Sequence, residues 1–280
     1  MLPNPERAQP ADAGNDTRAV RVALLGLGEA GSAIAIDLVN AGADVRGYDP
    51  LVAAPEGCAQ RRNEADAVRD ADLVLSVNSS HDAVPALSAA LDALRPGCVW
   101  ADLNTASPGL KQQLAAIIAS RDDGVLMVDV ALLAPVPGRG LRTPMMMSGL
   151  GAQRCADVLG AWGARVEVIE GPPGAAISRK LLRSVFYKGL AAAVVEALEG
   201  ASAADLEDWL RDNIATELAG FDRQTIDRLV EGTHTHARRR TDEMAAAAEQ
   251  LRELGVRPRV AMAAHDLLAE LRDRAAKPVS

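Results

Sequence analysis

Three glycines close to the N-terminus have the spacing of a nucleotide-binding turn. Gly26, Gly28 and Gly31 form a G-x-G-x-x-G sequence directly after the apolar run 21–25. In such a turn the first glycine allows a tight bend, the second lets the backbone approach a pyrophosphate, and the third lets a helix pack closely on a strand. The helix N-terminus then offers unpaired N–H groups and the positive end of its dipole to the phosphates. The pattern predicts a dinucleotide-binding site.

Asp49 indicates which dinucleotide binds. It follows a second strand-like run, 44–48. A carboxylate at the end of this strand can accept hydrogen bonds from both ribose hydroxyls, and it repels a 2′-phosphate. The sequence therefore favours NAD over NADP. Arg46, Arg61 and Arg62 leave NADP open, because one of these side chains could fold back toward a 2′-phosphate; as surface residues they would be solvated charges only.

Lys180 and Ser184 are candidates for chemistry on a bound substrate. They lie four residues apart in a helical segment that starts after Gly174, so they share one helix face. Beside a nicotinamide, a neutral lysine can accept the proton of a substrate hydroxyl as hydride leaves, and burial or nearby cations favour the neutral amine. Lys188 is the competing lysine, and a solvated helix lysine is the structural alternative.

Strand and helix patterns alternate around these residues. The predicted strands are 21–25, 44–48, 72–77, 98–102, 124–130, 144–149 and 165–170, and the predicted helices are 29–40, 83–94 and 108–120. This alternation predicts an α/β fold with a Rossmann-type, doubly wound and mainly parallel sheet. Ligands bind beyond the carboxyl ends of such strands. The residues expected to bind the cofactor are Gly26, Leu27, Gly28, Glu29, Ala30, Gly31, Asp49, Val77, Asn78 and Thr105.

After residue 170 the pattern is helical only. Helices are predicted over 175–199, 203–219, 222–229, 235–254 and 259–275. The expected organisation is a flexible tail, 1–18, a dinucleotide-binding Rossmann domain, 19–170, and an all-α domain, 171–280. The all-α domain begins with the long inter-domain helix and is expected to serve substrate binding and dimerisation.

The composition is typical of a cytoplasmic globular protein. The chain has 280 residues, of which 49% are hydrophobic and 2% aromatic, so alanine-rich helices must supply much of the core. A net charge of −8 argues against a nucleic-acid or anionic-membrane surface. No apolar run reaches the length of a membrane span, and the polar N-terminus does not resemble a signal peptide. Cys58, Cys98 and Cys155 lack metal-binding spacing and are expected to be reduced; no metal site is expected.

Taken together, these motifs resemble those of the β-hydroxyacid dehydrogenase superfamily, which includes 3-hydroxyisobutyrate dehydrogenase, tartronate semialdehyde reductase and 6-phosphogluconate dehydrogenase. The resemblance is greatest to a bacterial branch with a short helical C-terminal domain. The glycine turn and Asp49 match the first family motif. The second, D-x-S-T-x-x-P, corresponds to residues 102–108, where Asn104 replaces the serine.

Two further family motifs are present with departures. The substrate motif A-P-V-S-G-G corresponds to 134–139, where Pro137 has neither the hydroxyl nor the N–H of the usual serine and Arg139 adds a charge. Arg139 could bind a carboxylate or phosphate in bidentate fashion, or be a solvated loop residue. The helix motif G-x-x-G-x-G-x-x-x-K-x-x-x-N corresponds to 171–184, with Ala176 in place of the third glycine.

The retained lysine of that helix motif, Lys180, argues against the related imine reductases, which place Asp or Tyr there. The resemblance implies an NAD(P)-dependent dehydrogenase or reductase that moves hydride between C4 of the nicotinamide and a small hydroxy acid, while Lys180 exchanges the hydroxyl proton. The implied catalytic residues are Lys180, Ser184 and Asn104. The implied substrate-binding residues are Thr105, Pro137, Gly138, Arg139 and Lys180.

The resemblance also implies a homodimer formed through the helical domain and a small anionic substrate. By analogy with 6-phosphogluconate dehydrogenase, Arg239 or His236 of one subunit could contact the substrate of the other. In the alternative interpretation these two residues belong to an exposed helix start whose charge Asp242 and Glu243 balance.

Two other functions stay open. An imine or ketone reductase acting on a bulkier substrate would suit Pro137 and an apolar wall from Leu132 and Leu133. A non-catalytic, NAD(P)-binding regulatory protein would suit the loss of the substrate-motif serine, whereas the retained Lys180 counts against it.

Overall fold

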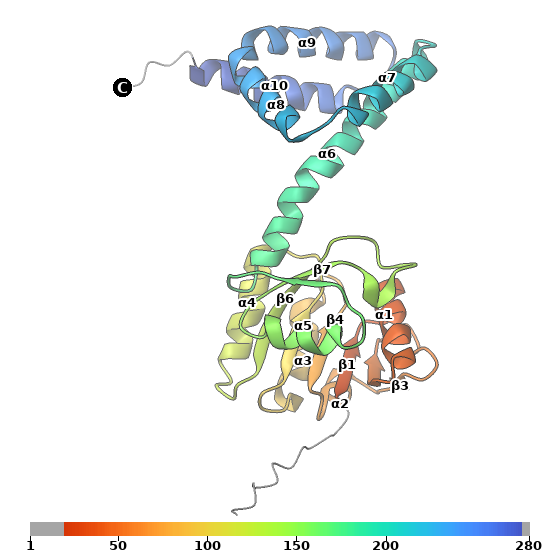
Figure 1. Cartoon of the computed structure of the whole chain (residues 1–280), viewed down its shortest axis with the longest axis vertical. Helices are drawn as coiled ribbons and strands as arrows, with labels where there is room; N and C mark the ends of the chain where they lie inside the picture. The colour runs from red at the N-terminus through yellow and green to blue at the C-terminus, as the bar shows by residue number, and fades with distance from the viewer. Residues whose placement is uncertain (1–19, 276–280) are drawn as a thin grey trace, which may run out of the picture. The chain divides into compact units, whose positions relative to one another are not determined.

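The computed structural model describes residues 20–275, and the expected tail 1–18 lies outside the described residues. The chain divides into two compact units after Leu182, within helix α6, Ala175–Ala203 (Figure 1). The predicted boundary at residue 170 comes earlier in the chain. The difference arises because the first turn of α6 packs into the first unit, where Ala176 and its neighbour are fully buried.

The first unit contains one eight-stranded sheet in the order β3-β2-β1-β4-β5-β6-β7-β8. Its strands are β1 Arg21–Leu25, β2 Asp44–Tyr48, β3 Ala59–Gln60, β4 Leu73–Ser76, β5 Val99–Asp102, β6 Leu126–Leu132, β7 Met145–Ser148 and β8 Val166–Val168. The strands from β3 to β6 pair in parallel, as the alternating pattern predicts. The prediction of a Rossmann-type sheet followed by helices is confirmed.

Helices cover both faces of this sheet (Figure 1). One apolar core lies between the sheet and helices α1, Glu29–Asn40, and α5, Ala152–Gly160. The other lies between the sheet and helices α2, Glu64–Val68, α3, Ala83–Ala90, and α4, Pro108–Ala119. Central strands such as β4 are buried throughout, which is why they read as continuous apolar runs rather than alternating ones.

Three elements were not predicted: β3, α2 and α5. The first two are short, and they lack a long periodic pattern. In α5 the residues Ala152, Cys155 and Leu159 are buried at helical spacing, so this helix carried a usable signal. Strand β7 runs antiparallel to β6 because only a loop, without a crossover helix, connects the two strands.

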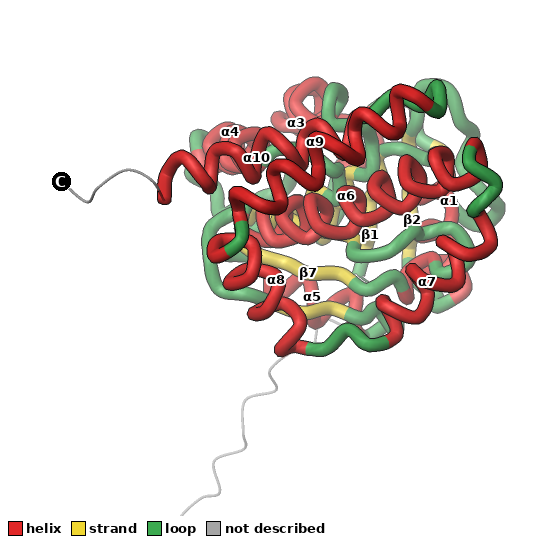
Figure 2. The backbone as a smooth tube through the Cα atoms, turned by 90° about the horizontal axis from the view of Figure 1, so that it is seen from above, coloured by secondary structure: helices red, strands yellow, loops and turns green. Residues whose placement is uncertain are grey.

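The second unit consists of the remainder of α6 and helices α7 Glu207–Ala219, α8 Arg223–Thr235, α9 Ala237–Glu253 and α10 Arg259–Ala275. Figure 2 draws this part of the chain as helices joined by loops. Helices α9 and α10 pack against each other, and Glu196 of α6 ties α10 to α6. Its carboxylate accepts hydrogen bonds from the N–H groups of Arg259, Val260 and Ala261, at 2.5, 2.8 and 2.8 Å.

Candidate functional site

The glycine turn between β1 and α1 has the geometry of a phosphate cradle. Gly26 has φ +92°, and a Cβ there would lie 2.5 Å from the carbonyl oxygen of Val77. A Cβ on Gly31 would collide with the carbonyl oxygen of Gly26. Gly28, by contrast, borders open space and begins α1 without a side-chain cap. The uncapped N–H groups of Glu29 and the residues after it are therefore available to an anion, and the cradle fits the pyrophosphate of a dinucleotide.

Asp49 holds this turn in place. Its Oδ2 accepts a hydrogen bond from the N–H of Leu27 at 2.8 Å, and its Oδ1 accepts from the N–H groups of Leu51 and Val52 at 2.8 and 2.9 Å. Partial burial by itself would raise the pKa of the Asp49 carboxyl, but these three donors outweigh it and the pKa is lowered. A carboxylate has about four acceptor positions. Asp49 therefore has room for one more donor while it fixes the turn to the end of β2.

The end of β4 lies beside the same turn. The N–H of Val77 donates to the carbonyl oxygen of Leu25 at 2.7 Å, and the side-chain NH2 of Asn78 donates to Ser76 Oγ at 3.2 Å. Both Val77 and Asn78 are half-buried. The residues predicted to bind the dinucleotide on β1, β2 and β4 thus lie next to one another along the carboxyl edge of the sheet.

The three arginines that left NADP open have different surroundings. Arg62 pairs with Asp66 of α2 at 3.3 Å and is a surface residue. Arg46 donates from Nη1 to the carbonyl oxygen of Arg69 at 3.0 Å. Arg61 follows β3, and its backbone N–H donates to Gly47 of β2 at 2.8 Å.

Lys180 and Thr105 are in direct contact. Lys180 Nζ donates a hydrogen bond to Thr105 Oγ1 at 2.8 Å. Thr105 is exposed in the loop after β5, and Lys180 is half-buried on the second turn of α6. This contact lies within the first unit and joins the loop after β5 to the start of α6. From the sequence, only the family motifs place these two residues in one site.

The neighbour of Thr105, Asn104, points into the protein. It is 3% exposed, and its side-chain NH2 donates to Asp102 Oδ2 at 2.7 Å and to Ser76 Oγ at 3.2 Å. The other oxygen of Asp102 accepts from Lys111 Nζ at 2.5 Å, and Lys111 is fully buried. Asn104 therefore lies one layer beneath Thr105, and its carbonyl Oδ1 is buried without a hydrogen bond within the described part of the chain.

The start of α6 is fixed by side chains from the sheet. Asp129 of β6 accepts hydrogen bonds at Oδ2 from the N–H groups of Gly174 and Ile177, at 3.0 and 2.9 Å. Ser148 of β7 accepts one from the N–H of Ala176 at 3.1 Å. Gly174 has φ +106°, and a Cβ there would lie 3.0 Å from the carbonyl oxygen of Pro108 at the start of α4. Glycine is thus needed where the two helix N-termini approach.

Pro137, Gly138 and Arg139 lie together on an exposed loop between β6 and β7. Asp37 of α1 anchors the end of this loop, because its Oδ2 accepts from the N–H of Leu141 at 2.8 Å. The Arg139 side chain donates only to Pro135 of the same loop, at 3.4 Å, among the described residues.

The remaining predicted residues belong to the second unit. Ser184 lies one turn beyond Lys180 on the same helix, and Lys188 is exposed one turn further. Arg239 forms an i,i+4 ion pair with Glu243 on the surface of α9, which agrees with the exposed-helix interpretation of this segment. His236 stands between α8 and α9.

The cysteines have no catalytic environment. All three are buried free thiols, and burial raises the pKa of Cys98 and Cys155 to about 12. Residues 20–275 contain no group of His, Cys, Asp or Glu side chains that could hold a metal ion. Within the same range, no helix is both long enough and apolar enough to cross a membrane.

Sequence reasoning missed the buried groups behind the site: Lys111, Asp129 and Ser148. Two signals were present. Lys111 shares the apolar face of its helix with Leu114 and Ile118, and Asp129 interrupts the apolar strand 126–132. A lysine and an aspartate at core positions of neighbouring elements indicate a buried ion pair, because an isolated buried charge is too costly.

Comparisons with known proteins cover both parts of the chain. A family model described as the NAD binding domain of 6-phosphogluconate dehydrogenase matches residues 21–170. A second model, described as a domain of unknown function (DUF1932), matches residues 201–271.

Three relatives illustrate the range of similarity. A protein named probable 3-hydroxyisobutyrate dehydrogenase from Mycobacterium tuberculosis is 31% identical over 134 residues, 46% of this chain and 45% of that protein, so the match spans about half its length. A conserved hypothetical protein from Sinorhizobium meliloti is 28% identical, with a TM-score of 0.61 over 94% of this chain and 92% of that one. An imine reductase from Myxococcus stipitatus is 16% identical, with a TM-score of 0.74 over 91% and 94% of the two chains, a likeness of fold alone.

Proposed function

Because the chain belongs to the family that carries the NAD binding domain of 6-phosphogluconate dehydrogenase, and so has an NAD(P)-binding, oxidoreductase-like fold, we propose that it is a hydride-transferring dehydrogenase or reductase. Its substrate would be a small hydroxy acid or a related carbonyl compound, and Lys180 would be the general acid and base. The observation that carries this proposal is the 2.8 Å hydrogen bond between Lys180 Nζ and Thr105 Oγ1 at the carboxyl edge of the sheet.

The glycine turn is the part of the protein that would hold the cofactor. The N–H groups at the start of α1 would bind the pyrophosphate, since the turn over Gly28 is open and uncapped. Asp49 would accept a ribose hydroxyl at its remaining acceptor position, and Val77 and Asn78 would line the route toward Thr105. A bound nicotinamide would supply or accept the hydride.

Lys180 would donate or accept the proton of the reaction. In the reducing direction its ammonium gives a proton to the carbonyl oxygen as hydride adds to the carbon, so that C=O becomes CH–OH and the lysine becomes neutral; in the oxidising direction the neutral amine takes the hydroxyl proton. Thr105 Oγ1 accepts a hydrogen bond from Lys180 and can donate one through its own hydroxyl to a substrate oxygen.

The test compares two lysines of one helix. Lys180→Ala should lower turnover about a hundred- to ten-thousandfold, the usual contribution of general acid–base catalysis. NADH affinity, measured by nicotinamide fluorescence, should change little, because the glycine turn is untouched. Lys188→Ala, the matched control, should behave like the wild type. Wild-type turnover by Lys180→Ala would remove this lysine from the mechanism, and NADH binding without turnover of any hydroxy acid, ketone or imine would favour a regulatory protein.

NAD is the proposed preferred cofactor, on the strength of Asp49. The lowered pKa of its carboxyl keeps the charge that repels a 2′-phosphate. Asp49→Ala should weaken NADH binding and narrow the difference in affinity between NADH and NADPH. Tighter NADPH binding by the wild type would overturn the assignment and point to Arg61 or Arg46.

A second candidate is an imine or ketone reductase with a bulkier substrate. Pro137 supports it, because this exposed residue has no N–H or hydroxyl to bind a carboxylate, and the half-buried Leu132 and Leu133 precede it. Rates on a 3-hydroxy acid and on a cyclic imine, measured side by side, decide between the two reactions.

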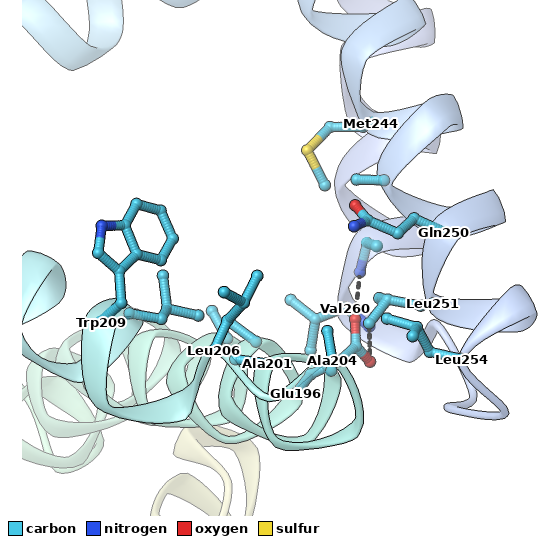
Figure 3. Close-up of a pocket in the computed structure, with 16 residues that line it drawn as sticks. Glu196, Ala201, Ala204, Leu206, Trp209, Met244, Gln250, Leu251, Leu254 and Val260 are labelled. Atoms are coloured by element: carbon cyan, nitrogen blue, oxygen red, sulfur yellow. Dashed lines mark hydrogen bonds between the residues drawn. The ribbon is translucent and has the colours of Figure 1, made fainter.

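We also propose that two copies associate through the second unit. A pocket of about 420 Å³, with Leu206 and Trp209 on one side and Met244 and Leu251 on the other, opens in this unit (Figure 3). The exposed large apolar residues of the unit are Val185, Phe186, Tyr187, Val195, Leu206, Trp209, Leu218, Phe221, Ile226, Leu229, Val230 and Leu267. Association between two copies would remove such exposed apolar side chains from water.

Sedimentation velocity tests this association. The wild type should sediment as a dimer, and Trp209→Glu should shift it to a monomer. Leu150→Glu, at a residue of the first unit that is 92% exposed, is the control and should stay dimeric. A monomeric wild type would contradict the proposal.

A further inference from the structure

Lys111 is a buried charge that the proposed reaction does not use. Its side chain is fully buried, as are those of its two carboxylate partners, Asp102 and Asp129. Lys111 Nζ donates to Asp102 at both Oδ1 and the backbone carbonyl, at 2.5 and 2.8 Å, and lies 3.2 Å from Asp129 Oδ1. Burying these charges is costly in free energy. We therefore ask which parts of the protein the Lys111 ammonium connects.

The two carboxylates reach the two sides of the Lys180–Thr105 contact. Asp102 binds the side chain of Asn104, and Asn104 directly precedes Thr105. Asp129 binds the N–H groups of Gly174 and Ile177. Ile177 lies less than one helical turn before Lys180. A closed ring therefore runs from Thr105 through Asp102, Lys111 and Asp129 to the start of α6 and back through Lys180.

The charges of this ring suit the helix that it holds. One ammonium between two carboxylates leaves one negative charge, and that charge faces the N-terminus of α6, where the helix dipole is positive. The ring therefore stabilises both the loop after β5 and the first turn of α6 at one point. A displacement of either element would move the Lys180 ammonium away from Thr105.

We propose that Lys111 is a positioning residue for Lys180: its ammonium, held between Asp102 and Asp129, sets the distance between the loop that carries Thr105 and the helix that carries Lys180. The catalytic consequence rests on the proposed function, whereas the geometric one does not. The experiment therefore needs a readout that does not depend on turnover.

The first measurement is the acylation rate of each lysine with acetic anhydride, followed by mass spectrometry. In the wild type, half-buried Lys180 should react more slowly than exposed Lys188 of the same helix. In Lys111→Met the ratio of the Lys180 rate to the Lys188 rate should rise severalfold, because Lys180 is released from Thr105. An unchanged ratio in a folded variant would overturn the proposal, whether or not the protein is an enzyme.

Two further variants separate positioning from loss of folding. Lys111→Met/Asp129→Asn keeps the net charge of the cluster at minus one and leaves an acceptor for α6, so it should fold and still show the raised ratio. Arg121→Met removes a part-buried cation that binds Leu94 and Asp123 at the opposite, amino edge of the parallel strands. It should lower stability while the ratio stays as in the wild type, and a raised ratio there would show that general loosening suffices.

The second measurement is kinetic and applies once a substrate is known. Lys111→Met should lower kcat about ten- to a hundredfold with less than a twofold change in NADH affinity, because the ring does not include the glycine turn. In a Thr105→Val background, where the contact is already lost, Lys111→Met should have a much smaller effect. Equal losses in both backgrounds would show that Lys111 does not act through this contact.

Discussion

Two helices of this chain begin at a carboxylate that comes from far away in the sequence. Asp129 accepts hydrogen bonds from Gly174 and Ile177 at the start of α6, and Glu196 accepts them from the first residues of α10. Both satisfy N–H groups that a helix N-terminus leaves unpaired. The two carboxylates differ in what lies behind them. Asp129 is fully buried against Lys111, whereas Glu196 borders an apolar pocket and forms no ion pair with a lysine of residues 20–275.

The two caps therefore differ in what they do: one only stabilises a helix, and the other also positions a residue of the candidate site. The Glu196 contact joins α6 to α10 within the helical unit, and none of its partners belongs to the candidate site. The Asp129 contact continues through Lys111 and Asp102 to the loop that carries Thr105. The Glu196 cap stabilises the start of α10 through hydrogen bonds alone. The Asp129 cap also connects the helix that carries Lys180 to the loop that carries Thr105, and we expect it to set the position of Lys180.

The largest expected effect is that of Asp129→Ala. The substitution leaves Lys111 with one carboxylate and leaves the buried N–H groups of Gly174 and Ile177 unpaired. The free energy of unfolding of the first unit should fall by about 3–5 kcal/mol, as when one partner of a buried ion pair is removed. Urea unfolding measures it, with Asp157→Ala, at an exposed residue of α5, as a control expected to change stability by less than about 0.5 kcal/mol. A loss as small as that control would mean that the cluster is not needed to hold α6.

The sequence predicts the parts of the site whose signals are local. Gly26, Gly28 and Gly31 follow a strand directly, so their positions in the turn follow from spacing. Lys180 and Thr105 could be related to one site through motif resemblance, although their hydrogen bond is a tertiary fact. Asp49 was predicted as a ribose acceptor, and that role stays a prediction. Its bond to the N–H of Leu27 needed the packing of β1 against β2.

The ring behind the site was not predictable at the same level. Lys111, Asp102 and Asp129 belong to three separate elements, and their meeting depends on the order of β5 and β6 and on the packing of α4. Hydrophobic pattern shows that a charge occupies a core position, but not which partner neutralises it. The loop with Pro137 and Arg139 is a similar case, because Asp37, which anchors it, lies about a hundred residues earlier in the sequence.

A smaller effect is expected from Glu196→Gln. The glutamine keeps an acceptor oxygen but loses the charge that strengthens three hydrogen bonds at the start of α10. Protection against hydrogen exchange at residues 259–261 should fall about five- to thirtyfold, equivalent to about 1–2 kcal/mol. NADH affinity should be that of the wild type, since the glycine turn lies in the other unit. An equal loss of protection at residues 174–177 would erase the proposed distinction between the two caps.

The smallest effect is the pH dependence of the Glu196 cap. Burial raises the pKa of this carboxyl, but the N–H groups of Ala261, Val260 and Arg259 and the charge of Arg259 outweigh it, so the pKa is below its ordinary value of 4.5. A group whose pKa is lower in the folded than in the unfolded state stabilises the fold fully above the unfolded value. That stabilisation is lost as the pH falls through the folded value. The protection of residues 259–261 in the wild type should therefore approach that of Glu196→Gln between pH 5 and about pH 3. A difference between the two proteins that stays constant over this range would mean that a neutral carboxyl caps α10 as well as a charged one.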